Sequence, residues 1–194
     1  MCGVRCTPSK ITLLYILHRT SNIVAMSRIC LLPGTFDPIT LGHVDIINRA
    51  LPLFDKIVVA IGSNIAKAPM FSAEQRVAWI EDIYKDEPKV TSAYYEGLTV
   101  NYCKNIGAKF ILRGIRYVSD FEYEKAIADA NRTLDNSIET IFLTGEPKYT
   151  SVASTIVRDI LRNGGNASHF LPNVVYKSIK KLSNAHLVQK GSGH

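Results

Sequence analysis

The sequence predicts an α/β fold in which helices cover both faces of one doubly wound parallel sheet. Five short apolar runs alternate along the chain with stretches in which apolar residues recur at helical spacing. Such continuous apolar strands are typical of parallel sheets that are buried on both faces. The chain has 194 residues, of which 46% are apolar and 21% charged, and this length and mixture suit one folded domain.

The predicted strands are apolar runs that end at turn-forming residues. Pro33 and Gly34 close the first run, and Gly62 closes the second, which is rich in β-branched residues. The five strands are expected at residues 28–32, 56–61, 89–94, 109–112 and 139–143. Right-handed crossovers between them would give a Rossmann-like sheet.

The predicted helices are recognised by their apolar spacing and their caps. Ser72 and Gln75 fit a capping box, which opens a helix with Val77, Ile80 and Tyr84 on one face. The remaining helices are expected at residues 42–54, where Val44, Ile47 and Leu51 recur; at 99–106, before Gly107; at 119–134, after a second capping box of Ser119 and Glu122; at 152–163, before Gly164; and after Pro172, as a C-terminal helix.

The formal net charge of +6 comes from the two ends of the chain. Residues 1–25 contribute +3 and residues 174–194 contribute +4, whereas residues 26–173 carry 16 basic and 17 acidic residues. The global charge therefore does not indicate a nucleic-acid-binding body. We expect a leader or upstream extension at 1–25 outside the fold, one domain at 26–182 and a C-terminal tail at 183–194. The leader fits the pattern of a secretion signal poorly.

No apolar run approaches the roughly 18 residues that span a bilayer, so we expect no membrane segment. The four cysteines, Cys2, Cys6, Cys30 and Cys103, contain no C-x-x-C pair. Free thiols in a reducing compartment are therefore a better interpretation than a zinc site.

The loop after the first strand carries the clearest functional pattern. It reads Pro33-Gly34-Thr35-Phe36-Asp37-Pro38-Ile39-Thr40-Leu41-Gly42-His43 and leads directly into a helix. Its glycines allow a ligand to approach the backbone closely. The free amides at the start of the helix offer an anion site, and His43 at the same end can donate to a phosphate.

Together with other motifs, this loop resembles the signature of bacterial phosphopantetheine adenylyltransferases, nucleotidyltransferases with a T/H-x-G-H motif. The other motifs are residues 67–71 (Lys-Ala-Pro-Met-Phe), 113–116 (Arg-Gly-Ile-Arg), 120–124 (Asp-Phe-Glu-Tyr-Glu), Asn131-Arg132 and 169–172 (His-Phe-Leu-Pro). The resemblance runs from about residue 28 to residue 182 and covers neither end of the chain.

The resemblance implies transfer of AMP from ATP to 4′-phosphopantetheine, which yields dephospho-coenzyme A and pyrophosphate. By the same resemblance, His43 stabilises the transition state and binds ATP, while Thr35 and Lys67 orient the attacking phosphate. That phosphate monoester is already ionised at neutral pH, so the reaction needs positioning and charge stabilisation rather than a general base. The sequence accordingly shows no evident nucleophile triad.

Further site residues carry over by resemblance alone. The ATP site would include Thr35, Phe36, His43, Gly114, Ile115, Arg116, Glu124, Tyr149, Thr150, Ser151, Val152, Ala153, Ser154 and Thr155, and the acceptor site would include Thr35, Lys67, Leu98, Thr99, Arg113 and Asn131. Some of them have simpler interpretations. Arg113 and Arg116 could form a solvated basic loop, although guanidinium suits phosphate. Glu124 could be an exposed helix charge, and Thr99 could be a helix cap.

The chain departs from the family at Ala153, where a serine is usual. Loss of that hydroxyl leaves the backbone amides intact, so we expect activity to persist, with Ser154 and Thr155 supplying the side-chain contacts.

The resemblance also implies partners and a compartment. We expect Mg²⁺ held through ATP phosphates and water, a homohexamer, feedback by coenzyme A and a cytoplasmic enzyme without nucleic-acid or membrane partners. One alternative is a transferase of the same superfamily that uses another phosphorylated acceptor, such as nicotinate mononucleotide, or a cytidylyl substrate. A remote alternative is a non-catalytic nucleotide- or RNA-binding module.

Overall fold

The computed structural model describes residues 27–63 and 68–191, with side chains described as far as residue 183. It contains one five-stranded sheet, and all of its strand pairs are parallel. The strands are β1 (Ile29–Gly34), β2 (Lys56–Gly62), β3 (Val90–Tyr95), β4 (Phe110–Ile115) and β5 (Glu139–Thr144). The predicted α/β class and parallel sheet are confirmed.

The strand order is β3-β2-β1-β4-β5, so the chain winds outward in one direction from β1 and then in the other. Leu31 of β1 pairs with Val58 on one side and with Ile111 of β4 on the other. In open sheets of this kind, ligands bind beyond the carboxyl ends of the strands, where the order reverses. That position here is the end of β1 and β4.

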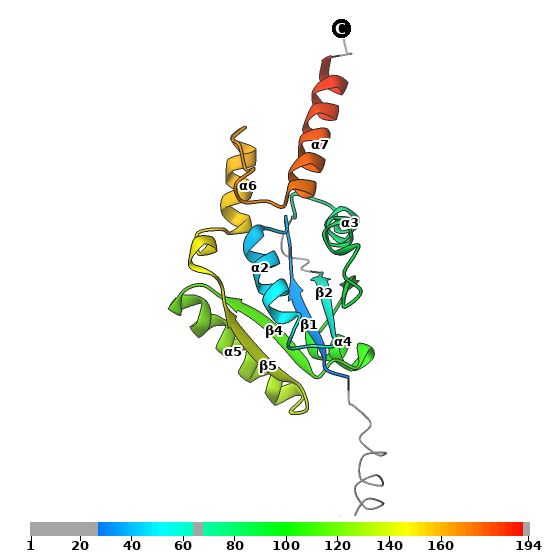
Figure 1. Cartoon of the computed structure of the whole chain (residues 1–194), viewed down its shortest axis with the longest axis vertical. Helices are drawn as coiled ribbons and strands as arrows, with labels where there is room; N and C mark the ends of the chain where they lie inside the picture. The colour runs from blue at the N-terminus through cyan, green and yellow to red at the C-terminus, as the bar shows by residue number, and fades with distance from the viewer. Residues whose placement is uncertain (1–26, 64–67, 192–194) are drawn as a thin grey trace, which may run out of the picture.

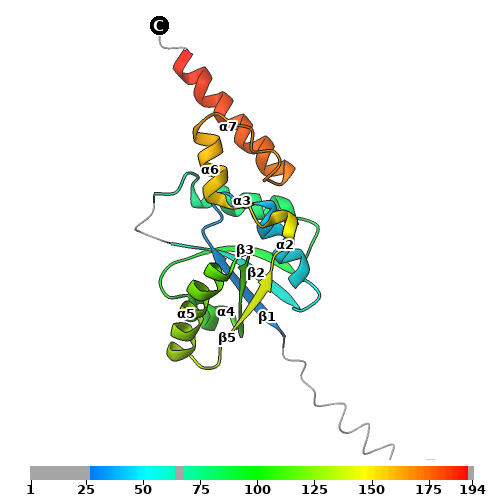
Figure 2. The same cartoon turned by 90° about the vertical axis from the view of Figure 1, so that its left-hand side faces the viewer.

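Helices cover both faces of the sheet (Figures 1 and 2). α2 (Leu41–Ala50) and α3 (Ala73–Tyr84) lie on one face, whereas α4 (Thr99–Ile106) and α5 (Val118–Leu134) lie on the other. α6 (Ser154–Arg162) and α7 (Asn173–Gly191) follow β5 and the short 3₁₀ helix η1 (Pro147–Tyr149), and α7 projects away from the sheet. α7 continues past residue 182, where the sequence suggested that the domain ends.

Each face of the sheet has its own hydrophobic core, because side chains alternate along each strand. Leu32, Ile57 and Val59 pack with Trp79 and Ile80 of α3, whereas Leu31 and Val58 pack with Cys103 of α4 on the opposite face. Trp79 is 2% exposed, in keeping with a packing role rather than a ligand contact. α5 differs from the other helices on the sheet because none of its 17 residues is buried.

Several predicted helix ends were wrong for local reasons. α2 ends at Ala50 rather than at residue 54, since Pro52 has no backbone N–H with which to continue the hydrogen bonding of the helix. α5 begins at Val118 rather than at the Ser119 box, because the Asp120 carboxylate accepts the amides of Arg116 and Tyr117. α6 begins at Ser154, two residues later than expected.

Other helix boundaries were predicted correctly. Ser72 caps α3 by accepting the amide of Gln75 at 3.3 Å. Gly107 ends α4 with a left-handed φ of 70°, which glycine adopts without a steric penalty. Within the described part of the chain, no helix is both long enough and apolar enough to cross a membrane.

Cys30 and Cys103 should resist alkylation in the folded protein. Both thiols are fully buried, and burial raises the pKa of Cys30 to about 12 and that of Cys103 to about 11. Since the thiolate is the reactive form, iodoacetamide should modify these two residues only after denaturation, as measured by peptide mass spectrometry. Rapid labelling of either residue in native protein would contradict this buried environment.

Candidate active site

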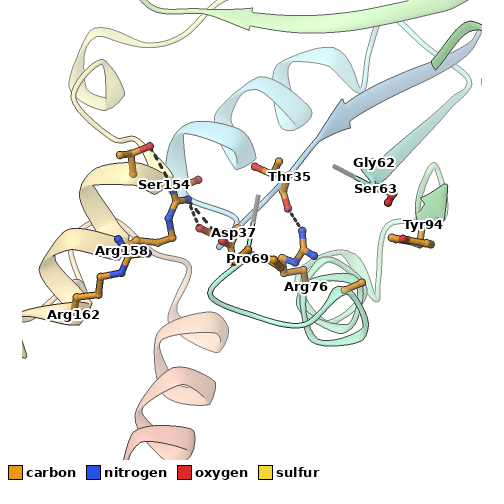
Figure 3. Close-up of a pocket in the computed structure, with 13 residues that line it drawn as sticks. Thr35, Asp37, Gly62, Ser63, Pro69, Arg76, Tyr94, Ser154, Arg158 and Arg162 are labelled. Carbon is orange, nitrogen blue, oxygen red and sulfur yellow. Dashed lines mark hydrogen bonds and ion pairs between the residues drawn. The ribbon is translucent and has the colours of Figure 1, made fainter. Parts of the chain in front are cut away.

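Three cavities open at the carboxyl edge of the sheet, and Thr35 lines all of them. The His43 cavity, of about 300 Å³, lies between the start of α2, the end of β4 and the start of α6. The Asn131 cavity, of about 440 Å³, is lined by Thr99, Arg113 and Asn131. The Arg158 cavity, of about 570 Å³, is shown in Figure 3 and lies beside α6. Thr35 is therefore the point at which groups bound in the three cavities could meet.

His43 is oriented by the residue that precedes its helix. The amide nitrogen of Thr40 lies 3.0 Å from His43 Nδ1, and an amide N–H can only donate. His43 thus replaces the acidic residue of a capping box by accepting the N-cap amide with its ring. The proton of the neutral ring must then sit on Nε2. The ring also packs edge-on against Phe36, with centroids 5.1 Å apart.

The surroundings of His43 keep its ring neutral. Burial of the ring lowers its pKa to about 4, and the positive charges of Arg116 and Arg113 act in the same direction. The group that faces the cavity is therefore a neutral N–H donor. Such a donor can stabilise an anionic oxygen through a hydrogen bond. It does not act as an acid, because the neutral ring keeps its remaining proton at neutral pH.

Arg113 is held rigidly on the border between two cavities. Its Nε donates to Glu124 Oε2 at 2.6 Å, its Nη2 donates to Glu124 Oε1, and its Nη1 donates to the carbonyl of Pro33. Both Arg113 and Glu124 line the His43 and Asn131 cavities. Three of the five N–H groups of the guanidinium are used in this way, so two remain for an anion.

Arg116 is held more loosely, on the α5 side of the His43 cavity. Its Nε donates to Asp120 Oδ2 at 3.1 Å, and 36% of its side chain is exposed. Burial alone would raise the pKa of Asp120, but hydrogen bonds from Arg116 outweigh burial and lower it. The partner carboxylate therefore stays ionised, and Arg116 keeps further N–H groups for a ligand.

The start of α6 supplies mainly backbone donors. The amide of Val157 makes the first hydrogen bond of the helix, to the carbonyl of Ala153 at 3.0 Å, so the three preceding amides have no partner within the helix. The Ser154 hydroxyl donates to the carbonyl of Pro38 at 2.8 Å, which occupies its only hydrogen. Among the hydroxyls predicted to replace the missing serine at 153, only that of Thr155 keeps its hydrogen for an anion.

The structure brings most of the predicted residues together. The His43 cavity is lined by Thr35, Phe36, His43, Gly114, Ile115, Arg116, Glu124, Tyr149, Val152, Ala153, Ser154 and Thr155, and the Asn131 cavity by Thr35, Thr99, Arg113 and Asn131. Among the described residues, Thr150, Ser151 and Leu98 do not line these cavities, and Leu98 is 54% exposed. Thr99 is the first residue of α4 rather than its cap, which is Leu98. Lys67 and the leader lie outside the described residues.

Three arginines of the Arg158 cavity were not predicted. Arg158 and Arg162 line it from α6, and Arg76 lines it from α3, where its Nη1 donates to the carbonyl of Thr35 at 2.6 Å (Figure 3). Arg158 and Arg162 are four residues apart and share one helix face with Ser154. These two arginines come directly after the predicted phosphate-binding motif, and their four-residue spacing is the sequence signal that could have identified them.

The chain is similar to known proteins over most of its length. Residues 31–160 match the Cytidylyltransferase-like family. The phosphopantetheine adenylyltransferase of Flavobacterium psychrophilum is 53% identical over 148 residues, which are 76% of this chain and 97% of that protein. The enzyme of the same name from Leptospira biflexa is 45% identical over 159 residues, which are 81% of this chain and 99% of that protein.

A solved structure supports the fold alone. The putative nicotinate-nucleotide adenylyltransferase of Vibrio parahaemolyticus superposes with a TM-score of 0.61 over 78% of this chain and 91% of that one, at 18% identity. The sequence identity to the curated relatives is far higher and extends over nearly their whole length. The chain therefore belongs to the phosphopantetheine adenylyltransferase family of nucleotidyltransferases.

Proposed function

We propose that this protein transfers the adenylyl group of ATP to 4′-phosphopantetheine, giving dephospho-coenzyme A and pyrophosphate. The observation that carries the proposal is the meeting of three cavities at Thr35, with the neutral N–H of His43 in one of them. This arrangement suits a reaction that joins two phosphorylated molecules. The name shared by the curated relatives supports the choice of acceptor.

The reaction would proceed by direct displacement. An ionised oxygen of the acceptor phosphate attacks the α-phosphorus of ATP, a new P–O bond forms, and the bond to the β-phosphate oxygen breaks to release pyrophosphate. No proton is removed from the nucleophile, which agrees with a His43 that cannot act as a base while it donates from Nε2. His43 instead stabilises negative charge on the α-phosphate.

The two substrates would enter from different sides. ATP suits the His43 cavity, where the α6 amides and Arg116 can bind its phosphates. The acceptor suits the Asn131 cavity, where Arg113 can hold its phosphate near Thr35. By resemblance, Lys67 would assist there. Coenzyme A contains both an adenylate and a pantetheine arm, so we propose that it competes across the same two cavities.

We propose that Mg²⁺ binds together with ATP. In the described ranges, no group of three or more His, Cys, Asp or Glu side chains is placed to hold a metal ion. By the family resemblance, the ion would be held mainly by nucleotide oxygens and water. When bound, Mg²⁺ would neutralise phosphate charge.

We also propose that the protein is a cytoplasmic homohexamer. α5 and the residues beside it expose several large apolar side chains, which are Leu98, Tyr117, Val118, Phe121, Tyr123, Ile127 and Leu134. Exposed apolar patches of this kind are typical of association surfaces. A second copy of this chain is the occupant that the family resemblance suggests.

Replacement of His43 should remove most of the activity without unfolding the protein. Loss of a preorganised donor to the transition state lowers kcat by about 100- to 1000-fold. We expect His43→Ala to show this loss in an assay of ATP-dependent pyrophosphate release with 4′-phosphopantetheine. The exposed His169, changed to Ala, is the matched control and should retain activity.

The same assay separates the alternatives. Exclusive turnover of nicotinate mononucleotide would replace the proposed acceptor with that of another transferase. Salt-sensitive RNA binding that survives His43→Ala, with no turnover of any acceptor, would favour the non-catalytic module.

A chain that begins at Met26 should be as active as the full chain if the leader is dispensable.

The His43 ring should stay neutral with its proton on Nε2 between about pH 5 and 8. The reason is its pKa of about 4, lowered by burial and by the neighbouring arginines. Histidine-selective ¹⁵N NMR, assigned by comparison with His43→Gln, should show no titration of this ring in that range. A midpoint near the ordinary value of about 6.5 would contradict the proposed neutral donor.

Oligomerisation should depend on the α5 face. Val118 is 76% exposed and Leu134 is 57% exposed, so a carboxylate at either position would be buried without a partner in an assembly that covers that side of α5. Light scattering should show a hexamer of the 21.5 kDa chain and smaller species for Val118→Asp and Leu134→Asp. Leu53→Asp, away from α5, should leave the assembly intact, and a wild-type monomer would contradict the proposal.

A further inference from the structure

Phe36 has a backbone conformation that residues with side chains rarely adopt. Its φ is 44°, and no other residue of the described ranges except glycine has a positive φ. A positive φ is unfavourable for a bulky residue because the side chain crowds the backbone. Conformations of this kind are found mainly at functional sites, where the surrounding structure holds them. Phe36 follows β1 directly and lines the His43 cavity.

Contacts on both sides of Phe36 hold its backbone in place. The carbonyl of Thr35 accepts a hydrogen bond from Arg76 Nη1 at 2.6 Å. The carbonyl of Asp37 accepts one from Arg158 Nη1 at 2.8 Å. Figure 3 shows these two arginines beside the loop, one from α3 and the other from α6. Relaxation of Phe36 toward a common φ would have to disturb at least one of these contacts.

The ring of Phe36 lies between the end of β1 and the start of α2. Phe36 is 3% exposed, and its ring packs edge-on against the His43 ring, with centroids 5.1 Å apart. The ring also covers Gly34, where a β-carbon would lie only 2.9 Å from two of the ring atoms. Since real β-carbons do not approach other atoms so closely, the ring occupies this place because residue 34 has no side chain.

The Phe36 ring supplies a constraint on His43 that the hydrogen bond from Thr40 does not. That hydrogen bond joins the Thr40 amide to Nδ1 and fixes one point of the His43 ring. It does not by itself fix the plane of the ring. The Phe36 ring provides a wall against which His43 packs edge to face, an arrangement that aromatic pairs favour. Together the two contacts determine the direction in which Nε2–H points.

We propose that Phe36 is a positioning residue, whose ring, held against Gly34 by a strained backbone, fixes the orientation of the His43 ring. The inference rests on the proposed adenylyl transfer, because the effect of Phe36 on the reaction would act through His43. It differs from the contact with ATP that the family resemblance implies for Phe36. It also gives Gly34 a specific role, since this glycine leaves the space that the ring fills.

The first test separates turnover from substrate binding. Phe36→Leu keeps an apolar side chain but removes the flat ring, so His43 loses its wall. Because a misplacement of about 1 Å can cost about 100-fold in rate, kcat should fall by about 10- to 100-fold, while KM for each substrate changes by less than about 3-fold. Phe54→Leu is the matched control. Phe54 is also 3% exposed and packs against the Phe110 ring, so this variant should lower Tm but not kcat.

The second test asks whether Phe36 acts through His43. If it does, loss of the Phe36 ring costs nothing more once the His43 ring is gone, so the two effects should not add. The double variant Phe36→Leu/His43→Ala should therefore have the kcat of His43→Ala to within about 2-fold. A further fall as large as that of Phe36→Leu in the wild-type background would show that Phe36 acts independently of His43, and it would overturn the inference.

The third test uses Gly34. Gly34 does not have a positive φ, so Gly34→Ala introduces a collision with the Phe36 ring rather than backbone strain. This variant should displace the ring and reproduce the loss of kcat. Leucine is smaller than phenylalanine, so the double variant Gly34→Ala/Phe36→Leu should be no slower than Phe36→Leu alone.

Other results would also overturn the inference. An unchanged kcat in Phe36→Leu, with a lower Tm, would show that the ring only fills the core. A change confined to KM for ATP would assign the ring to substrate binding. If Phe36→Leu does not fold, Gly34→Ala carries the test, and an unchanged kcat or failure to fold in that variant would count against positioning. Absence of adenylyl transfer by the wild type is a separate result that would remove the proposed function itself.

Discussion

The hydrogen bond from the Thr40 amide to His43 Nδ1 is the contact on which the chemistry of the site depends. It satisfies the cap of α2, fixes the orientation of the ring and leaves the ring proton on Nε2. The first amides of a helix need hydrogen-bond partners from outside the helix. Because His43 supplies one, this local requirement also sets the tautomer of the proposed catalytic ring. The sheet contributes by ending β1 just before this helix, at the edge where the strand order reverses.

Charge balance around His43 explains how a site for two anions avoids an excess of positive charge. Arg113 is paired with Glu124, Arg116 with Asp120, and Arg158 contacts Asp37. Each pairing fixes the direction of a guanidinium and leaves other N–H groups for a ligand. A rigid donor that is already oriented loses less conformational entropy when a phosphate arrives, which favours binding. The pairing therefore positions the cations and limits their mutual repulsion.

The sequence was most informative where structure follows from neighbouring residues. The cap at Ser72 and the stop at Gly107 depend on interactions within a few residues, and each strand is recognised by its own short apolar run; the structure agrees with each of these predictions. At α5 the sequence predicted the helix but credited Ser119 with its cap, whereas the Asp120 carboxylate accepts two amides that precede the helix. At Ser154, a hydroxyl expected to bind ATP is taken by Pro38, a partner 116 residues away, which no local pattern can indicate.

The same reason explains why the sequence showed Asp37 only as part of a motif and did not single out Asp45. An aspartate that follows a strand or lies on a helix suggests an exposed charge, and only the folded chain brings the amides of Met70, Phe71 and Glu146 to these carboxylates. Backbone amides are present in every sequence, so the segments they belong to carry no signal of the contact. A carboxylate that must replace its lost hydration with such amides constrains the fold tightly, since any shift of either segment leaves a buried charge unpaired.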